Sequence, residues 1–578
     1  MKRQLILTAD ERAWPKDKKQ PVLFLGEWCK LYSRKKRWQD LDSKTLPYHW
    51  DDREKLYQDT IYLDKLYEKL LPQLADNLNK IHNTNYSLRY WRIIVGWWLN
   101  YFISITYDRY LSIKSLDVSK VKSCKMIDII SVARHNREFI EWAENDLYNQ
   151  KIYIDIIKNL NYFKVEKILK KELETVKTAI EKQHFWLKTF LFGGYLRLLP
   201  LVFKKHIFFY SYLRPRNLIK LQLKLKQTLH LEFTKITYKE IGINYIKRNK
   251  FIFNKVNDEF ANTVLAMIPK YIPKSYVESF VDIKKQVNKK YPNNPKTITT
   301  ASAHLNNDGF KIWAAEMVEK GSKLFISQHG GNDGTAKWSF YLKHEFEIAD
   351  KFISWGWNKW QGHQATPLPA NKLSYKINYN PKGDILLVCM SLPRYSYHLY
   401  SSPVSQQVLI YIQEQINIAK KLNPKLRKLI KYRIYKIDYG WGIKQRITDT
   451  GFGDLIDSQT NLNKNFYQRL SECRLCVTTY NATTFLETFS ANYPTLIFWD
   501  KKYWELSNEA KPYYNELLNI GILHYTVESL VKRLEQVYEN PMKWWLQEDV
   551  QMVVNKFSKQ FAYTSKNWLN EWKGIYKL

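Results

Sequence analysis

The sequence predicts an α/β protein in which two Rossmann-like domains face each other across a cleft, with a large helical insertion in the N-terminal domain. A chain of 578 residues is too long for one hydrophobic core. From residue 295 onward short apolar strands alternate with amphipathic helices, which indicates parallel sheets. A stretch rich in Pro, Asn and Lys at 364–383 interrupts that alternation and reads as a linker. We therefore expect an N-terminal domain over 1–370 and a C-terminal domain over 384–578.

The N-terminal domain is expected to begin with a buried strand at 21–26, which ends in a glycine turn with Glu27 at its tip. From residue 51 to about residue 110, apolar residues recur at helical spacing. We interpret 51–255 as a helical, basic insertion. Beyond it the expected strands lie at 296–300, 323–327 and 348–356, with a helix at 309–320 between the first two.

A glycine-rich turn follows the strand at 323–327 and forms the first candidate site. Its residues are Gln328, His329, Gly330 and Gly331. Two glycines let the backbone turn sharply and approach a ligand closely, and ligands of open α/β sheets bind at the carboxyl ends of strands. His329 is thereby a candidate base or a donor to an anion. A glycine turn with a chance histidine is the plainer alternative.

The C-terminal domain offers the second candidate site, where a strand at 475–480 leads into a polar turn and a helix. Asn481 or Thr483 is expected to cap that helix. Free N–H groups in its first turn, around Thr484, would favour a phosphate. Glu487 lies about one turn further on, where it could accept hydrogen bonds from hydroxyl groups. A capped helix with Glu487 on a solvated face remains the alternative. Other expected strands lie at 384–390, 432–435 and 495–499, and a further helix at 404–422.

The charge of the chain favours anionic partners, because its formal net charge is +35. No acidic residue occurs between Gln183 and Leu231, and the basic residues there alternate with aromatic and apolar ones, among them Phe208 and Phe209. This pattern is typical of a segment lying on an anionic membrane surface. A helical insertion with a solvated basic face explains it equally well. We expect no nucleic-acid partner, since zinc-finger spacing and other recognition signatures are missing.

The expected location is the cytoplasm, with possible attachment to the cytoplasmic face of the inner membrane. The first ten residues contain no long apolar region typical of a secretory signal. No run of about 18 uncharged apolar residues predicts a membrane span. Five cysteines, an odd and low number, suit a reducing compartment.

Taken together, these segments resemble a family of bacterial transferases encoded in O-antigen and lipopolysaccharide biosynthesis regions. They run through nearly the whole chain in order. More distantly, the His-Gly turn and the Asn-x-Thr-Thr-x-x-x-Glu helix look like glycosyltransferases of the GT-B type. One departure is Asp333, which stands where this family usually has an aromatic residue. The matching segments are 8–11, 24–29, 47–53, 89–92, 328–331, 348–350, 354–357, 439–441 and 479–487.

The resemblance implies a transferase that moves a sugar from a nucleotide-activated donor to a surface-polysaccharide or lipopolysaccharide acceptor. In that arrangement the C-terminal domain holds the donor phosphate, and the N-terminal domain presents a glycan or lipid-linked glycan. We expect no cofactor and no divalent metal, because no clear Asp-x-Asp ends a strand. His329 or Glu27 would be the base. The donor side would comprise Asn481, Thr483, Thr484 and Glu487, with Arg394 or Arg433 as the cation, and Gln328, Gly330 and Gly331 would form the cleft loop.

Two other functions fit the same sequence. One is a transferase that moves a polyol-phosphate unit from a cytidine nucleotide, which would use a similar cleft and histidine loop. The other is a basic protein that binds a nucleic acid or a membrane without catalysis. This function would explain the net positive charge, but it would give no role to either of the two polar turns.

Overall fold

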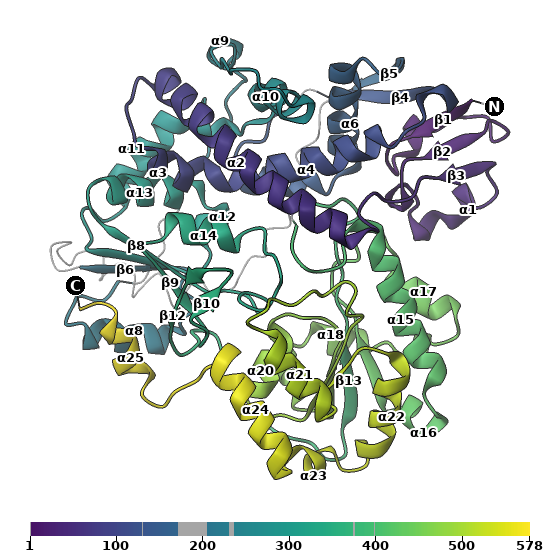
Figure 1. The fold of residues 1–578 in the computed structure, drawn as a ribbon, viewed down its shortest axis with the longest axis vertical. Helices are drawn as coiled ribbons and strands as arrows, with labels where there is room; N and C mark the ends of the chain where they lie inside the picture. Colours follow the sequence, from purple (N-terminus) through teal and green to yellow (C-terminus); the bar gives the residue numbers. More distant parts are fainter. Residues whose placement is uncertain are drawn as a thin grey trace.

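Three parallel β-sheets of five strands each form the framework of the protein (Figure 1). The computed structural model describes residues 2–129, 131–171, 205–230, 236–373, 376–397 and 399–577. All strand pairs within these three sheets are parallel, so the carboxyl ends of each sheet's strands share one edge.

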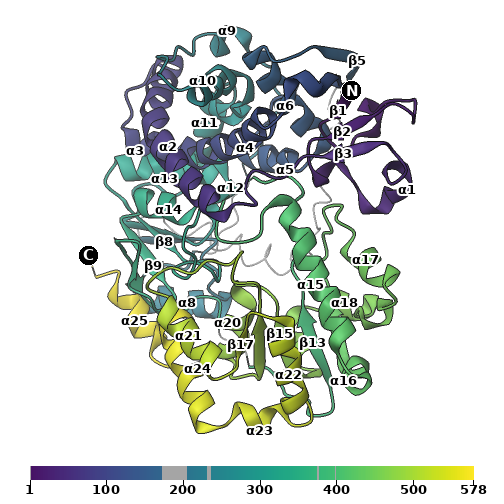
Figure 2. The same ribbon diagram turned by 45° about the vertical axis from the view of Figure 1, so that its right-hand side comes forward.

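The first sheet has the strand order β3-β2-β1-β4-β5 and occupies the N-terminal part of the chain. Its strands are β1 (Arg3–Ile6), β2 (Val22–Phe24), β3 (Ser43–Thr45), β4 (Val121–Ile129) and β5 (Val165–Lys171). Between β3 and β4 the chain forms a helical layer that lies between the first and second sheets (Figures 1 and 2). This part of the layer consists of α2 (Arg53–His82), α3 (Leu88–Trp91), a π-helical turn (Arg92–Gly96) and α4 (Trp97–Lys114).

The longest helix, α2, has clear stop and start signals. The Asp52 side chain accepts hydrogen bonds from the N–H groups of Glu54 and Lys55, which caps the first turn. Asn83 ends the helix in the left-handed conformation, with a φ of 52°. The sequence predicted a helix in this range, and the structure confirms it.

The second sheet has the order β12-β9-β8-β7-β6. Its strands are β6 (His206–Phe209), β7 (Thr297–Thr300), β8 (Lys323–Ser327), β9 (Lys351–Ser354) and β12 (Thr366–Pro367). Helices α12 (Ala303–Asn306) and α13 (Asp308–Glu319) join β7 to β8, and α14 (Leu342–Ile348) precedes β9. Earlier in the chain, β4 and β5 are separated by α5 (Asn136–Ala143) and α6 (Asp146–Leu160). Between β6 and β7 lie α8 (Pro215–Lys224), α9 (Tyr245–Arg248), α10 (Glu259–Tyr271) and α11 (Phe280–Lys290).

The third sheet has the order β14-β13-β15-β16-β17 and lies at the bottom of Figure 1. Its strands are β13 (Asp384–Val388), β14 (Ile430–Arg433), β15 (Cys473–Thr478), β16 (Thr495–Phe498) and β17 (Leu523–His524). Its larger helices are α15 (Val408–Lys421), α20 (Thr483–Ser490), α21 (Lys511–Asn519), α22 (Val527–Val537) and α24 (Glu548–Phe561). Smaller ones are α16 (Pro424–Leu429), α17 (Ile443–Asp449), α18 (Gln459–Asn463), α19 (Phe466–Leu470) and α23 (Pro541–Trp545).

The α/β class with parallel sheets is confirmed, but the interpretation of 51–255 as helical needs correction. That range also contains β4, β5 and β6, so the described residues form three five-stranded parallel sheets where the sequence predicted two such sheets. The apolar side chains Phe208 and Phe209 belong to β6 and are buried, at 2 % and 3 % exposure. Their hydrophobic character therefore serves the second sheet rather than a membrane. Residues 183–204, with the basic side chains Lys188, Arg197 and Lys204, lie outside the described residues.

No helix among the described residues is long and apolar enough to cross a membrane. Several helices of the third-sheet region are amphipathic instead and bury one face. In α22, for example, Leu530 and Leu534 are buried one helical turn apart.

The last helix, α25 (Trp568–Gly574), leaves the third sheet and packs beside α8 at the second sheet (Figure 1). Trp572 is buried there with Phe325 and Ile353, and its indole N–H donates to the carbonyl oxygen of Pro369 at 2.9 Å. The C-terminus thus ties the two sheets together.

Replacing Trp572 with alanine should lower the free energy of unfolding by about 3–5 kcal/mol, because it leaves a cavity beneath α25. The exposed residue Lys577 supplies a control, and Lys577→Ala should change the stability by less than about 0.5 kcal/mol. Urea unfolding monitored by circular dichroism measures both. Equal stability of the two variants would contradict the docking of α25.

Candidate functional site

The carboxyl edge of the second sheet carries a cluster of polar side chains. His304 follows β7, and Gln328 and His329 follow the neighbouring strand β8. The Gln328 side chain shapes the turn: its amide donates to the carbonyl oxygen of Gly330 at 2.7 Å, and its oxygen accepts from the N–H of Trp355 at 2.8 Å. Gln328 thus holds the turn against the end of β9.

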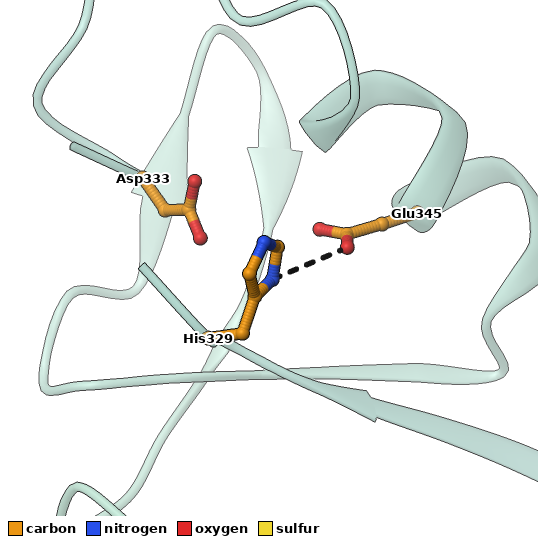
Figure 3. Close-up of side chains that lie close together, drawn as sticks. All are labelled: His329, Asp333 and Glu345. Carbon is orange, nitrogen blue, oxygen red and sulfur yellow. Dashed lines mark ion pairs between the residues drawn. The ribbon is translucent and has the colours of Figure 1, made fainter. Parts of the chain in front are cut away.

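His329 lies between the carboxyl groups of Asp333 and Glu345, which point toward it from opposite sides (Figure 3). The distance from His329 Nδ1 to Glu345 Oε1 is 3.6 Å. His304 lies behind the same carboxylate oxygen, with its Nε2 at 2.8 Å. Asp333 comes from the loop after the glycines and Glu345 from α14, so residues from several parts of the chain meet here.

Burial determines the protonation of this cluster. The side chains of Asp333 and Glu345 are almost completely buried, with exposed fractions of 1 % and 0 %. For Asp333, burial and the neighbouring Glu345 raise the pKa well above its usual value, opposed by the Tyr341 hydroxyl and the Gly330 amide. Burial likewise raises the pKa of Glu345 well above normal. Burial and the nearby His304 lower the pKa of His329 to about 3, so its imidazole is neutral.

The histidine loop touches the start of helix α20 in the third-sheet region. A Cβ atom added at Gly331 would lie 2.2 Å from the backbone nitrogen of Thr483 and 2.3 Å from the carbonyl carbon of Ala482. Only a residue without a side chain permits this approach. The side-chain amide of Asn481 also donates to the Thr335 hydroxyl at 3.3 Å. The two turns singled out from the sequence therefore lie in direct contact.

The start of α20 differs from the expectation in one respect. Its N-cap residue is Ala482, which provides no side-chain hydrogen bond, so neither Asn481 nor Thr483 caps the helix. The Asn481 oxygen instead accepts from the Tyr514 hydroxyl at 2.9 Å, and Thr484 shares a 2.6 Å hydrogen bond with Tyr480. The sequence could not show this, because Tyr514 is distant in the chain. The first turn of α20 thus begins without a side-chain cap from the described residues.

Lys372 links the two turns electrostatically. It is close enough to contribute to lowering the pKa of His329 and to oppose the burial that raises the pKa of Glu487. Its ammonium group also lies 5.8 Å from the centre of the Tyr212 ring. Glu487 is half-buried, and the Tyr467 hydroxyl also stabilises its ionised form. A cation, a carboxyl group and an imidazole therefore interact at the junction of the two sheets.

The two predicted arginines have other contacts. The guanidinium of Arg394 forms an ion pair with Asp146 at 2.8 Å and donates to the carbonyl oxygens of Tyr439 and Trp28. Those bonds tie the first sheet to the third-sheet region. Arg433 donates to the carbonyl oxygens of Asn461 and Lys464, at 3.1 and 2.8 Å. Both guanidinium groups thus already bind protein oxygens, and neither interacts with His329 or Glu487 in the way that Lys372 does.

Glu27 lies at the carboxyl end of β2 in the first sheet, as the sequence predicted, and it begins a short 3₁₀ helix. Its carboxylate pairs with Lys30 at 2.8 Å, and its backbone N–H donates to Gln406 at 2.9 Å. The contacts described for the histidine loop do not include it. A role for Glu27 or His329 as general base stays a prediction.

Sequence reasoning did not single out Lys372, Glu345 or His304. Lys372 lies in the stretch that the composition marked as a linker. Glu345 and His304 are separated from His329 by 16 and 25 positions, without a recognisable spacing. A histidine four positions after the end of a predicted strand was the available signal for His304, since the carboxyl ends of neighbouring parallel strands meet at one edge.

The three parallel sheets, with polar groups where the edges of two of them touch, define an α/β protein of the kind that binds ligands at strand ends. Residues 3–575 match the model of the LIC12162 family transferases. The chain therefore belongs to this transferase family. A comparison with curated proteins finds no match.

Replacing Gly331 with alanine should lower the free energy of unfolding by about 1–3 kcal/mol, because its Cβ would collide with the backbone at Thr483. The neighbouring Gly330 is a matched control: its Cβ would meet nothing nearer than the Tyr341 hydroxyl at 3.8 Å. Chemical unfolding of both variants measures the difference. If Gly330→Ala proves as destabilising as Gly331→Ala, the close contact is not the cause.

Proposed function

We propose that this transferase moves a glycosyl group from a nucleotide-activated donor to a glycan or lipid-linked glycan acceptor. The observation that carries the proposal is the contact between Gly331 and the start of α20, beside Lys372 and Glu487. A helix start and a cation at the edge of a parallel sheet suit a phosphate group. The resemblance of the His-Gly turn and of the α20 segment to glycosyltransferases of the GT-B type supports the same reaction.

The chemistry requires stabilisation of the leaving nucleotide. When the bond between sugar and phosphate breaks, negative charge collects on the phosphate oxygens. The first-turn N–H groups of α20 and the ammonium of Lys372 can stabilise that charge, since preorganised donors and cations are most effective where charge develops. Lys372 takes the role that the sequence assigned to Arg394 or Arg433. Glu487 then accepts hydrogen bonds from hydroxyl groups of the ribose or the sugar.

The acceptor and the location belong to the same proposal. A surface-polysaccharide or lipopolysaccharide precursor that carries phosphate or acidic sugars would suit a chain with a formal net charge of +35. We place the reaction at the cytoplasmic face of the inner membrane, where such a precursor is accessible. The transfer of a polyol phosphate from a cytidine nucleotide would use the same phosphate contacts, so the nucleotide base distinguishes the two reactions.

Thermal unfolding with UDP, GDP, CMP and CDP tests the donor. A nucleotide that binds the folded chain at about 100 times its Kd stabilises it by about 2.7 kcal/mol and raises the melting temperature. We expect stabilisation by UDP or GDP. Stabilisation by the cytidine nucleotides alone would favour polyol-phosphate transfer, and no effect of any nucleotide would contradict a nucleotide-activated donor.

Replacing Lys372 with methionine should weaken binding of the stabilising nucleotide by about 10- to 100-fold, because one cation next to the phosphate is lost. The exposed Lys382, in the same connecting stretch, provides the control. Lys382→Met removes the same charge away from the site and should leave the affinity unchanged. Isothermal titration of both variants decides the matter, and equal affinities would remove Lys372 from the site.

A further inference from the structure

Two buried carboxyl groups at the base of the histidine loop form no ion pair with a lysine or an arginine of the described residues. Asp333 and Glu345 are almost completely buried, and both point at the imidazole of His329 (Figure 3). Buried carboxylates are normally paired with a cation or a metal ion. Over the described ranges of the chain, neither group forms an ion pair with a lysine or an arginine. The two carboxyl groups could therefore accept a positive charge, and no neighbouring lysine or arginine of the described residues provides one.

Several polar atoms in this cluster lack hydrogen bonds of normal geometry within the described part of the chain. They are both carboxyl oxygens of Asp333, Oε2 of Glu345 and Nδ1 of His329. Buried polar atoms in proteins nearly always have a partner, so such a concentration requires an explanation. These four atoms, on three converging side chains, could act as ligands of a bound metal ion.

The distances suit a single ion. One ligand atom from each of the three side chains lies within 4.8 Å of the other two. Two ligands that are each about 2.1 Å from one ion are about 3.0–4.2 Å apart, depending on the angle between them. The 3.6 Å between His329 Nδ1 and Glu345 Oε1, the oxygen that His304 also contacts, falls in that range, so the imidazole and this carboxyl group are close enough to share an ion. Ligand atoms as far apart as 4.8 Å would have to approach by about 0.6 Å to reach the upper end of that range. No other such group occurs in the part of the chain that the structure describes.

We propose that His329, Asp333 and Glu345 bind one divalent transition-metal ion, with Mn²⁺ and Zn²⁺ as the best candidates. Two carboxylates and a neutral imidazole around a doubly charged ion give a buried site with no net charge. A mixed nitrogen and oxygen ligand set favours these ions, whereas Mg²⁺ prefers oxygen ligands and keeps several waters.

His304 positions one of the ligands. Its Nε2 lies 2.8 Å from Glu345 Oε1, and hydrogen bonds of this kind fix the orientation of a coordinating carboxylate. His304 is itself completely buried. Lys372, the cation that influences His329, is the group that opposes ion binding.

An ion in this position would fix the loop whose Gly331 contacts α20. The sequence led us to expect a reaction without a divalent metal, because no clear Asp-x-Asp pair ends a strand. Here the ligands come from positions 329, 333 and 345 instead. Ion binding does not depend on glycosyl transfer, so failure of either proposal leaves the other standing.

The test is ion binding to the full chain after dialysis against a chelator. Titration with Mn²⁺, Zn²⁺ and Mg²⁺ should show about one Mn²⁺ or Zn²⁺ per chain and weaker Mg²⁺ binding. Asp333→Asn and Glu345→Gln should each weaken Mn²⁺ and Zn²⁺ binding at least about 100-fold. Asp64→Asn is the matched control: this carboxyl group pairs with Lys343 outside the cluster and should leave ion binding unchanged.

The amide variants should fold, because each replaces a buried acid with a neutral group of the same shape. Their melting temperatures without metal should equal or exceed that of the unchanged chain. A second readout does not need these variants: Mn²⁺ bound to the unchanged chain should show magnetic coupling to one imidazole nitrogen in electron spin-echo spectra. Absence of Mn²⁺ and Zn²⁺ binding at millimolar concentrations, absence of that coupling, or equal affinities in all variants would overturn the proposal.

Discussion

The close approach of Gly331 to the backbone of Ala482 and Thr483 is the constraint on which the candidate site depends. It brings the carboxyl edge of the second sheet against the first turn of α20, which follows a strand of the third. Neighbouring backbone contacts extend this junction: the N–H of Ser507 donates to Thr335 at 2.8 Å, and Ala336 pairs with Leu506. Because a side chain at 331 would separate the two surfaces, one glycine determines how near their polar groups come.

Burial controls the electrostatics on the second-sheet side of this junction. Water is excluded from Asp333 and Glu345, so their charged forms are unfavourable unless a cation accompanies them. The same exclusion keeps His329 neutral. A general base works best with a pKa near the operating pH. A base role for His329 would therefore require a change in its surroundings when substrate binds, and it stays a prediction.

Two partly buried ion pairs join the N-terminal part of the chain to the third-sheet region, away from the histidine loop. Arg394 pairs with Asp146, which lies at the start of α6 next to the first sheet. Arg53, at the start of α2, forms a bidentate pair with Glu505 and also donates to Gln407 at 2.9 Å. A bidentate guanidinium–carboxylate pair fixes orientation as well as distance. Arg394, one of the two arginines that the sequence assigned to the phosphate, thus joins the first-sheet region to the third-sheet region.

The sequence by itself determined the α/β class, most strands of the second and third sheets, and the two polar turns. Those features are local: apolar strands, glycines and polar strand ends are visible within about ten residues. It missed β1 and β3 in the first sheet and the short edge strands β12 and β17. It also missed β4, β5 and β6, since basic and helical surroundings masked their apolar residues. Only the tertiary structure decided that Lys372 influences both His329 and Glu487, that Asn481 binds Tyr514, and that Asp333, Glu345 and His304 gather around His329. His304 and His329 meet because the neighbouring parallel strands β7 and β8 end at a common edge, and Glu345 reaches them from a helix. Such contacts between separate elements leave no regular spacing in the chain.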